Sequence, residues 1–297
     1  MTTLLITGAG GQLGSDLRAA AAAGGVAATG LASGALDITD RAAVRRAVSD
    51  FAHGAVRPVV INAAAYTAVD AAETDAERAF AVNESGARNL AEAAAEHGAG
   101  LIHVSTDYVF PGDAQRPYQV DDPTGPKNVY GASKLAGEQA VLTAHPAAHV
   151  VRTAWVYGAA SGGNFVKTMA KLESTNPSIT VVDDQLGSPT WTADLAAGLI
   201  ALAGADIPGG VLHATGAGQT SWFGFARAIF EELGADPERV QPTTSDAFPR
   251  PAPRPAYSVL SADAWRAAGL PSLRHWREAL AEAFRLHSSA FRPRTGD

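Results

Sequence analysis

A tyrosine and a lysine four positions apart, Tyr130 and Lys134, carry the clearest chemical potential in this 297-residue chain. They lie at the start of a stretch predicted to be helical, and positions i and i+4 share one face of a helix. A phenol with a pKa of ~10 is a poor acid near neutral pH, but a nearby ammonium favours its ionised form and lowers that pKa. The pair predicts a proton-transfer site, against the alternative of a half-buried tyrosine beside a surface lysine.

Two hydroxyl side chains, Ser105 and Thr106, follow at the end of an apolar run that predicts a strand. In a parallel sheet, ligands bind beyond the carboxyl ends of the strands. A hydroxyl in that position can meet Tyr130 over a bound ligand. We therefore expect Tyr130, Lys134 and Thr106 to form one catalytic group.

Three glycines, Gly8, Gly11 and Gly14, come directly after the first predicted strand and before a predicted helix. Glycines here permit a tight turn, close approach of the backbone to a pyrophosphate and close packing of helix on strand. The helix N-terminus then offers free N–H groups to phosphates. This placement predicts a dinucleotide site, although a flexible turn is the alternative in a chain with 30 glycines.

The region after the second predicted strand carries neither an acid for a ribose hydroxyl nor an arginine for a 2′-phosphate in Leu31–Gly34. Asp37 and Ile38 follow shortly after, and we expect them at the adenine ring. The alternative for Asp37 is an N-cap or loop charge before the helix predicted at Arg41. The expected cofactor is NADPH or NADH, with the two not separated.

These groups must be positioned by a sheet, because short apolar runs alternate with longer amphipathic stretches through the first 150 residues. Strands are predicted at Leu4–Thr7, Val26–Leu31, Val59–Asn62, Leu101–Ser105 and Val150–Thr153. Helices are predicted near Leu13–Ala23, Arg41–Phe51, Val82–His97 and Val129–Ala144. The fold class is α/β: a Rossmann-type doubly wound parallel sheet with a smaller C-terminal substrate-binding lobe.

The rhythm changes near Gly158 to shorter elements separated by glycine and proline. We expect a dinucleotide-binding domain over residues 1–157, to which part of roughly 187–220 returns, and a substrate-binding lobe over 158–297. Four prolines between Asp246 and Pro255 predict a loop. Its Arg250 and Arg254 are interpreted as solvated surface charges, with contact to a diphosphate as the alternative.

Composition narrows the class of partner. Lys and Arg total 23 against 30 Asp and Glu, a net charge of -7 that argues against nucleic acid or an anionic membrane surface. The most apolar stretch, Leu195–Ala205, is far shorter than the ~20 residues of a membrane span. The chain has no cysteine, and its eight histidines form no metal motif. No secretory signal is visible, so the expected location is cytoplasmic. We expect no bound metal.

Several motifs together resemble one family, the dTDP-4-dehydrorhamnose reductases of the extended short-chain dehydrogenase/reductase superfamily. The resemblance is carried by the glycine loop and by NAAAYTAVD at Asn62–Asp70, STDYVF at Ser105–Phe110, NVYGASKLAGE at Asn128–Glu138 and RTAWVYG at Arg152–Gly158. Later matches are Asn164–Val166, Asp184–Thr190 and Thr220–Trp222, so nearly the whole chain is covered.

The resemblance implies NAD(P)H-dependent reduction of the C4 ketone of dTDP-4-dehydro-6-deoxy-L-mannose to dTDP-L-rhamnose. This is the last step of dTDP-rhamnose biosynthesis, which leads to cell-wall polysaccharide, and a homodimer is expected from the family. Tyr130 would donate the proton, Lys134 would lower its pKa and hold the nicotinamide ribose, and Thr106 would bond the reacting oxygen or Tyr130. The implied substrate-binding residues are Thr106, Asp107, Trp155 and Asn164. The implied cofactor-binding residues are Gly8, Gly10, Gly11, Gln12, Leu13, Gly14, Asp37, Ile38, Ala63, Ala64, Ala65, Thr67, Tyr130 and Lys134.

Other functions are compatible with the same predicted fold. Sugar-nucleotide 4,6-dehydratases carry Thr-Asp-Glu where this chain has Thr106-Asp107-Tyr108, so the elimination base is missing. An epimerase with tightly bound nicotinamide is not excluded by any motif. A non-catalytic nucleotide-binding role, like that of the regulatory subunit of methionine adenosyltransferase, is also open, with the intact Tyr/Lys/Thr group against it.

Overall fold

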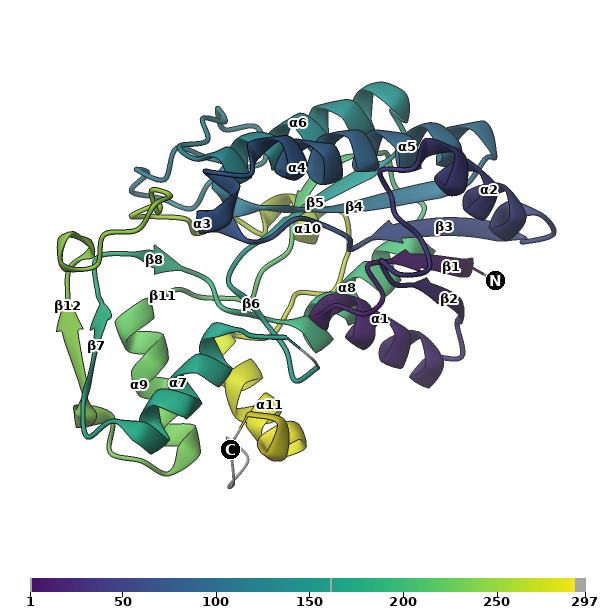
Figure 1. Ribbon diagram of the computed structural model, residues 1–297. Helices are drawn as coiled ribbons and strands as arrows, with labels where there is room; N and C mark the ends of the chain where they lie inside the picture. Colours follow the sequence, from purple (N-terminus) through teal and green to yellow (C-terminus); the bar gives the residue numbers. More distant parts are fainter. Residues whose placement is uncertain (1, 161, 292–297) are drawn as a thin grey trace.

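A six-stranded parallel sheet forms the centre of the computed structural model, which describes residues 2–160 and 162–291 (Figure 1). Its strand order is β10-β5-β4-β3-β1-β2, and every neighbouring pair is parallel. The strands are β1 (Thr2–Thr7), β2 (Ala27–Leu31), β3 (Arg57–Asn62), β4 (Gly100–Thr106), β5 (His149–Thr153) and β10 (Gly210–His213). The five strands predicted from the apolar runs are present, and the α/β fold class is confirmed.

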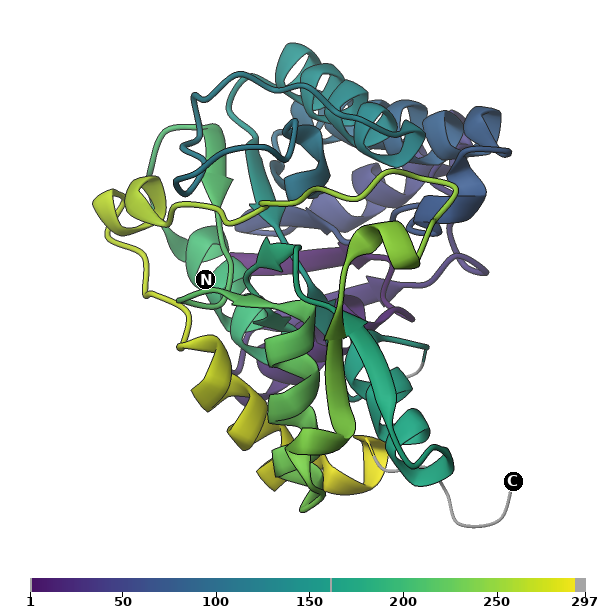
Figure 2. The same cartoon turned by 90° about the vertical axis from the view of Figure 1, so that its left-hand side faces the viewer.

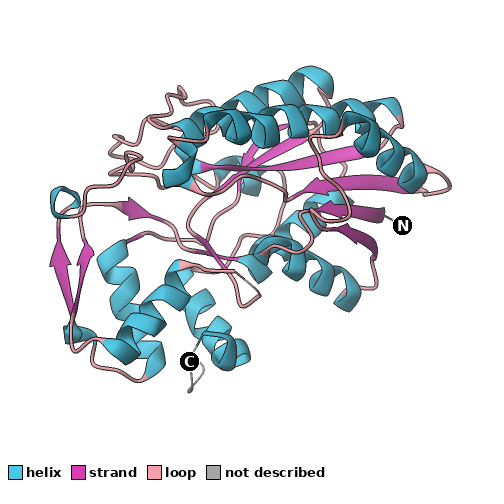
Figure 3. Cartoon of the chain, in the orientation of Figure 1, coloured by secondary structure: helices cyan, strands magenta, loops and turns pink. Residues whose placement is uncertain are grey.

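Helices cover both faces of the sheet because alternate side chains of each strand point to opposite faces. Leu4 and Ile6 of β1 pack with α1 (Gln12–Ala23) and α8 (Thr192–Gly204), whereas the intervening Leu5 packs on the opposite face. That face is covered by α2 (Arg41–Ala52), α5 (Ala87–Glu96) and α6 (Val129–Ala144). Figure 3 shows these two helical layers on either side of the strands.

The helix predicted at Val82–His97 is interrupted. The helical segment begins earlier than predicted, with α4 (Ala76–Phe80), and continues through a π-helical turn η1 (Ala81–Gly86) into α5; a short α3 (Val69–Ala72) precedes it. The turn packs closely on the preceding loop, since a Cβ on Gly86 would lie 2.6 Å from the Ile38 side chain. It also directs Asn83 toward Ser133 of α6 and the backbone of Tyr66.

A second hydrophobic core lies among the helices of the C-terminal half, α7 (Phe165–Thr175), α9 (Trp222–Leu233) and α11 (Trp276–Phe291). The short strands there form the pairs β7 (Ile179–Val182) with β12 (Val240–Thr243), β8 (Leu186–Gly187) with β11 (Thr220–Ser221), and β6 (Val156–Tyr157) with β9 (Thr190–Trp191). The remaining elements are α10 (Asp263–Ala267) and the 3-10 turns η2 (Asp107–Val109), η3 (Pro237–Arg239) and η4 (Ser245–Ala247). Of the described helices, none combines the length and apolar character needed to cross a membrane.

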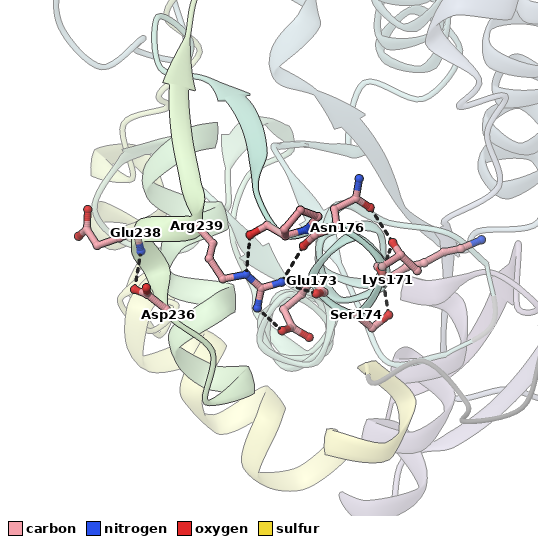
Figure 4. Close-up of polar contacts among 9 residues, drawn as sticks. Lys171, Glu173, Ser174, Asn176, Asp236, Glu238 and Arg239 are labelled. Atoms are coloured by element: carbon pink, nitrogen blue, oxygen red, sulfur yellow. Dashed lines mark hydrogen bonds and ion pairs between the residues drawn. The ribbon is translucent and has the colours of Figure 1, made fainter.

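Arg239 joins the end of α7 to the start of β12 (Figure 4). Its guanidinium bonds the Glu173 carboxylate at 2.7 Å and the carbonyl oxygens of Glu173, Asn176 and Pro177 at 2.6, 2.7 and 3.0 Å. The Arg239 side chain thus caps the C-terminus of α7 by donating to carbonyl oxygens, because the last carbonyls of a helix have no partner within it.

The segment after η4 contains the predicted proline-rich loop, and it is free of helix and strand from Phe248 to Pro255. In Figure 2 this part of the chain runs across the molecule toward α10. It is fixed to the first half of the chain by Asp70, which accepts from Ala252 N at 3.3 Å and pairs with Arg254 at 2.9 Å. The interpretation of Arg254 as a solvated surface charge is therefore wrong, while Arg250 is exposed.

Candidate active site

The glycine loop between β1 and α1 is a tightly packed cradle. Gly8 has a left-handed φ of +68°, and a Cβ there would lie 2.6 Å from the backbone carbon of Ala63. A Cβ on Gly14 would lie 2.2 Å from Gly8 O, so α1 packs directly on the turn. Gly11 is the N-cap of α1 and donates to Gly8 O at 3.0 Å. The cradle places the N-terminus of α1 and its unpaired N–H groups beyond β1, as a dinucleotide pyrophosphate requires.

Replacement of Gly14 by alanine is expected to weaken NAD(P)H binding by up to about 100-fold, since overpacking at a rigid site costs up to ~3 kcal/mol. The added methyl would overlap Gly8 O and displace α1 from the turn. Gly204→Ala is the control, because a Cβ there meets nothing within 4 Å. Equilibrium titration of cofactor fluorescence checks both variants, and unchanged affinity in Gly14→Ala would remove the cradle from the cofactor site.

The other residues expected at the cofactor follow β2 and β3. Ala63, Ala64 and Ala65 lie partly exposed beside Gly8, and Thr67 is exposed on the same segment. Asp37 is exposed, and Thr39 donates its backbone N–H and hydroxyl to the Asp37 carboxylate at 2.9 and 2.8 Å. These bonds lower the pKa of Asp37. Ile38 is buried under Gly86, which leaves Asp37 as the exposed member of the pair.

The catalytic trio predicted from the sequence is brought together between β4 and α6. Asn128 caps α6 by accepting from Gly131 N at 2.8 Å. Gly131 permits close approach of η2, because a Cβ there would lie 2.2 Å from Tyr108 O. The Thr106 hydroxyl lies close enough to the Tyr130 phenol to lower its pKa, and the Tyr108 ring meets the Tyr130 ring edge-on with centroids 5.5 Å apart.

Burial controls the acidity of this trio. It raises the pKa of Tyr130 to about 12, against the smaller effect of the Thr106 hydrogen bond. It lowers the pKa of Lys134 to about 8, against the charge of Glu138. The Tyr130 pKa is thus raised rather than lowered, contrary to the expectation from the sequence, and Lys134 Nζ donates to Val104 O at 2.7 Å.

Asp107 is the expected substrate-binding residue that contacts the trio, through Thr106. Thr106 donates its hydroxyl to Asp107 Oδ1 at 2.9 Å, and its oxygen accepts from Tyr108 N at 3.3 Å. Asp107 is buried, and burial raises the pKa of its carboxyl to about 6. A carboxyl with that pKa exchanges its proton close to neutral pH.

Trp155 and Asn164, the other expected substrate residues, lie where the two halves of the chain meet. Among the described non-glycine residues, Trp155 is the one with a positive φ, +48°, and it stacks on Trp222 with centroids 3.5 Å apart. Such backbone costs on the order of 1 kcal/mol and is typical of functional sites. Asn164 caps α7 and donates to Gln12 Oε1 at 2.8 Å, while Gln12 donates to Gly163 O at 3.0 Å. Gln12 and Asn164 therefore tie the glycine loop to the second half.

Sequence reasoning missed residues whose contacts span long separations. Asn128 also donates to Pro253 O at 2.9 Å, so the cap of the catalytic helix holds the proline-rich segment. Arg18 of α1 lies over Gly30 at the end of β2, where a basic residue was sought only in the following loop. Asn62 and His103 lie buried beneath Lys134. The position of Asn62 at the end of β3 is a signal that the sequence contains, whereas His103, in the middle of β4, has no such local signal.

A parallel sheet with a glycine cradle, and a Tyr/Lys/Thr group beyond the same sheet edge, define an NAD(P)H-dependent oxidoreductase of the extended short-chain dehydrogenase/reductase type. The family model described as the RmlD substrate binding domain matches residues 1–288, and the chain belongs to that family.

Curated and solved relatives agree with this assignment. The dTDP-4-dehydrorhamnose reductase of Mycobacterium tuberculosis strain H37Rv is 57% identical over 284 residues, 94% of this chain and 91% of that protein. The dTDP-4-keto-6-deoxy-D-glucose reductase of Streptomyces niveus is 46% identical over 95% of this chain and 96% of its own. A crystal structure of dTDP-4-dehydrorhamnose reductase from Bacillus anthracis in complex with NADP has a TM-score of 0.90 and 38% identity, covering 96% of this chain and 100% of that one.

Proposed function

We propose that this chain reduces the C4 ketone of dTDP-4-dehydro-6-deoxy-L-mannose to dTDP-L-rhamnose, with Tyr130 as the proton donor. The observation that carries the assignment of roles is that Tyr130 lies next to Thr106 and on the same helix as buried Lys134, at the sheet edge that also carries the glycine cradle. High identity to named reductases supports the reaction.

The cofactor is held by the start of α1 and by the segments after β2 and β3. Gly8 and Gly14 let the turn pack closely on Ala63 and on α1, and Gln12 and Leu13 offer N–H groups of the first helical turn to the pyrophosphate. Ala63–Ala65 and Thr67 lie along it, Asp37 and Ile38 are nearest the adenine, and Lys134 reaches the ribose. Bound NADH or NADPH supplies a hydride to C4 of the sugar.

The chain's own residues handle the proton. As the C4 carbonyl gains its new C–H bond, the π electron pair moves to oxygen, and that oxygen takes the phenol proton of Tyr130. A pKa of about 12 keeps Tyr130 protonated at neutral pH, so the donor is ready before reaction. Once that proton has left, the Thr106 hydroxyl is placed to donate to the phenolate, and the Lys134 ammonium stabilises the phenolate until solvent returns a proton.

The substrate lies between the cofactor lobe and the substrate lobe. We assign residues 1–157 to the cofactor lobe and 158–297 to the substrate lobe, and the pairing of β10 with β5 supports the return of part of 187–220 to the first. Asp107, Trp155 and Asn164 flank the space for a dTDP-linked sugar. The enzyme acts in the cytoplasm, as a homodimer without a metal. Its product is a precursor of cell-wall polysaccharide.

One alternative has a specific observation behind it, namely that a close relative is named as a reductase of dTDP-4-keto-6-deoxy-D-glucose. The two sugars differ in ring configuration and share the C4 ketone, so the same trio serves both. A dehydratase is disfavoured because the position of its glutamate is occupied by Tyr108, whose ring packs on Tyr130.

A stoichiometric assay tests the proposal. The 4-keto sugar in the L-manno and D-gluco configurations is supplied with NADH and NADPH in parallel. We expect one cofactor oxidised per sugar reduced, with the L-manno ketone preferred. Cofactor that copurifies and is never consumed would instead assign an epimerase, and binding without turnover would assign a regulatory subunit.

A further inference from the structure

A line of buried polar side chains runs beneath the active site, from β1 through β3 and β4 to α6. Thr7 donates its hydroxyl to Asn62 Oδ1 at 2.7 Å, and Asn62 Nδ2 lies 3.0 Å from His103 Nδ1. His103 Nε2 in turn lies 3.4 Å from Lys134 Nζ. All four residues are buried, and all except Lys134 are absent from the proposed chemistry.

The direction of these hydrogen bonds is fixed by the backbone. Asn62 Oδ1 accepts from Ala64 N at 3.1 Å, and a backbone N–H only donates. The amide oxygen of Asn62 must therefore face Ala64, which turns the Nδ2 donor toward His103. His103 Nδ1 consequently accepts, and a neutral imidazole that accepts at Nδ1 carries its hydrogen on Nε2.

The Nε2–H of His103 thus points at the amine of Lys134. Lys134 Nζ already donates to Val104 O at 2.7 Å. A neutral amine has a lone pair that accepts from an N–H, whereas an ammonium has none and meets a hydrogen of like partial charge. The line of side chains therefore favours the neutral form of Lys134 and fixes the direction of its remaining N–H groups.

We propose that His103 is a positioning residue of the active site: held as the Nε2–H tautomer by Asn62, it orients Lys134 and favours its neutral amine. The inference rests on the proposed function for the role of Lys134, but the tautomer and the lysine titration are properties of the protein alone.

The surrounding charges agree with this role. Burial, and then the charge of Lys134, lower the pKa of His103 well below its usual value, so the ring stays neutral. On the α6 side Glu138 raises the pKa of Lys134, but Glu138 is itself paired with Arg152 of β5. Across the site, the charge of Asp107 raises the pKa of Tyr130, and Asp70 acts on the neighbouring Tyr108.

The direction of the pH effect follows from the lysine. Lys134 is an ammonium below its pKa of about 8 and loses that charge as the pH rises through it. Because the ammonium stabilises the phenolate of Tyr130, the reduction rate is expected to fall above about pH 8. Removal of the His103 N–H raises the lysine pKa and moves this descending limb to higher pH.

Nitrogen-15 NMR of the imidazoles in the full chain tests the tautomer directly. We expect His103 to show a protonated Nε2 and an unprotonated Nδ1 from pH 6 to 9. Protonation at Nδ1, or a charged ring within this range, would overturn the proposal. This measurement needs neither substrate nor turnover, so it is independent of the failure or success of the reductase assignment.

Two variants then test the effect on Lys134. Asn62→Asp supplies a carboxylate that demands an Nδ1–H, which reverses the tautomer, and His103→Phe removes the N–H altogether. Both are expected to raise the Lys134 pKa by about one unit, a typical size for loss of one specific interaction. The readouts are titration of lysine Cε in labelled protein and the descending limb of the kcat profile.

The exposed His53→Gln serves as the matched control, expected to leave both readouts unchanged. A merely structural His103 would lower the unfolding midpoint and leave the lysine titration and the pH limb in place, which contradicts the proposal. Should His103→Phe fail to fold, the wild-type tautomer and the Asn62→Asp titration still decide the question.

Discussion

Tyr130→Phe is expected to lose between about 10²- and 10⁴-fold of the ketone-reduction rate while NAD(P)H still binds, because general acid catalysis contributes that range. The phenol hydroxyl is the proposed proton donor to the C4 oxygen, whereas the ring itself packs against Tyr108. Removal of the hydroxyl leaves this packing in place. Single-turnover reduction and cofactor titration on the same preparation separate the two effects.

Tyr157→Phe is the matched control for this prediction. Tyr157 is also a buried tyrosine, in the second core, and its hydroxyl has no hydrogen-bond partner among the described residues. Its loss is expected to leave the rate close to that of the parent. Near-parental turnover in Tyr130→Phe would remove Tyr130 from the mechanism.

Glu138→Gln is expected to lower the free energy of unfolding by about 3–5 kcal/mol, the usual cost of a buried charge that loses its partner. Arg152 Nε lies 2.9 Å and Nη2 lies 2.7 Å from the Glu138 carboxylate, and both side chains are at most 5% exposed. The neutral amide leaves the guanidinium, which lies over the Phe110 ring, buried without a counter-charge. Urea denaturation followed by circular dichroism measures the change.

Glu282→Gln provides the comparison, since Glu282 pairs with the exposed Arg285 on the surface of α11. Surface pairs are screened by solvent, so we expect a small change in the unfolding midpoint. Equal midpoints for Glu138→Gln and Glu282→Gln would show that the buried pair does not hold α6 against β5.

The central sheet could be predicted from the sequence because parallel strands buried on both faces are continuous apolar runs. The catalytic helix Val129–Ala144 was predicted with its observed bounds, since Asn128 supplies a local cap. The π-helical turn at Ala81–Gly86 was not predicted. Its residues make contacts with distant segments, such as Gly86 with Ile38 and Asn83 with Ser133, which local periodicity does not encode.

In the candidate site too, some residues could be predicted from local sequence and others could not. The glycine loop and the Tyr/Lys pair each lie within one short segment, so residue type and spacing reveal them. The missed contacts join distant segments: Asn62 and His103 are 41 positions apart, and Asp70 and Ala252 are 182 apart. Arg254 was misassigned for this reason, because its partner is fixed by the tertiary fold.

The central claim is that a hydride from the nicotinamide arrives at C4 of the dTDP-linked keto sugar and stays there. Incubation of the enzyme with the L-manno 4-keto sugar and NADPH dideuterated at the nicotinamide C4 tests it most directly, by NMR of the product. The account predicts one deuterium at C4 of dTDP-L-rhamnose for each cofactor oxidised. Product without deuterium at C4, or an unchanged sugar with the cofactor still reduced, would contradict it.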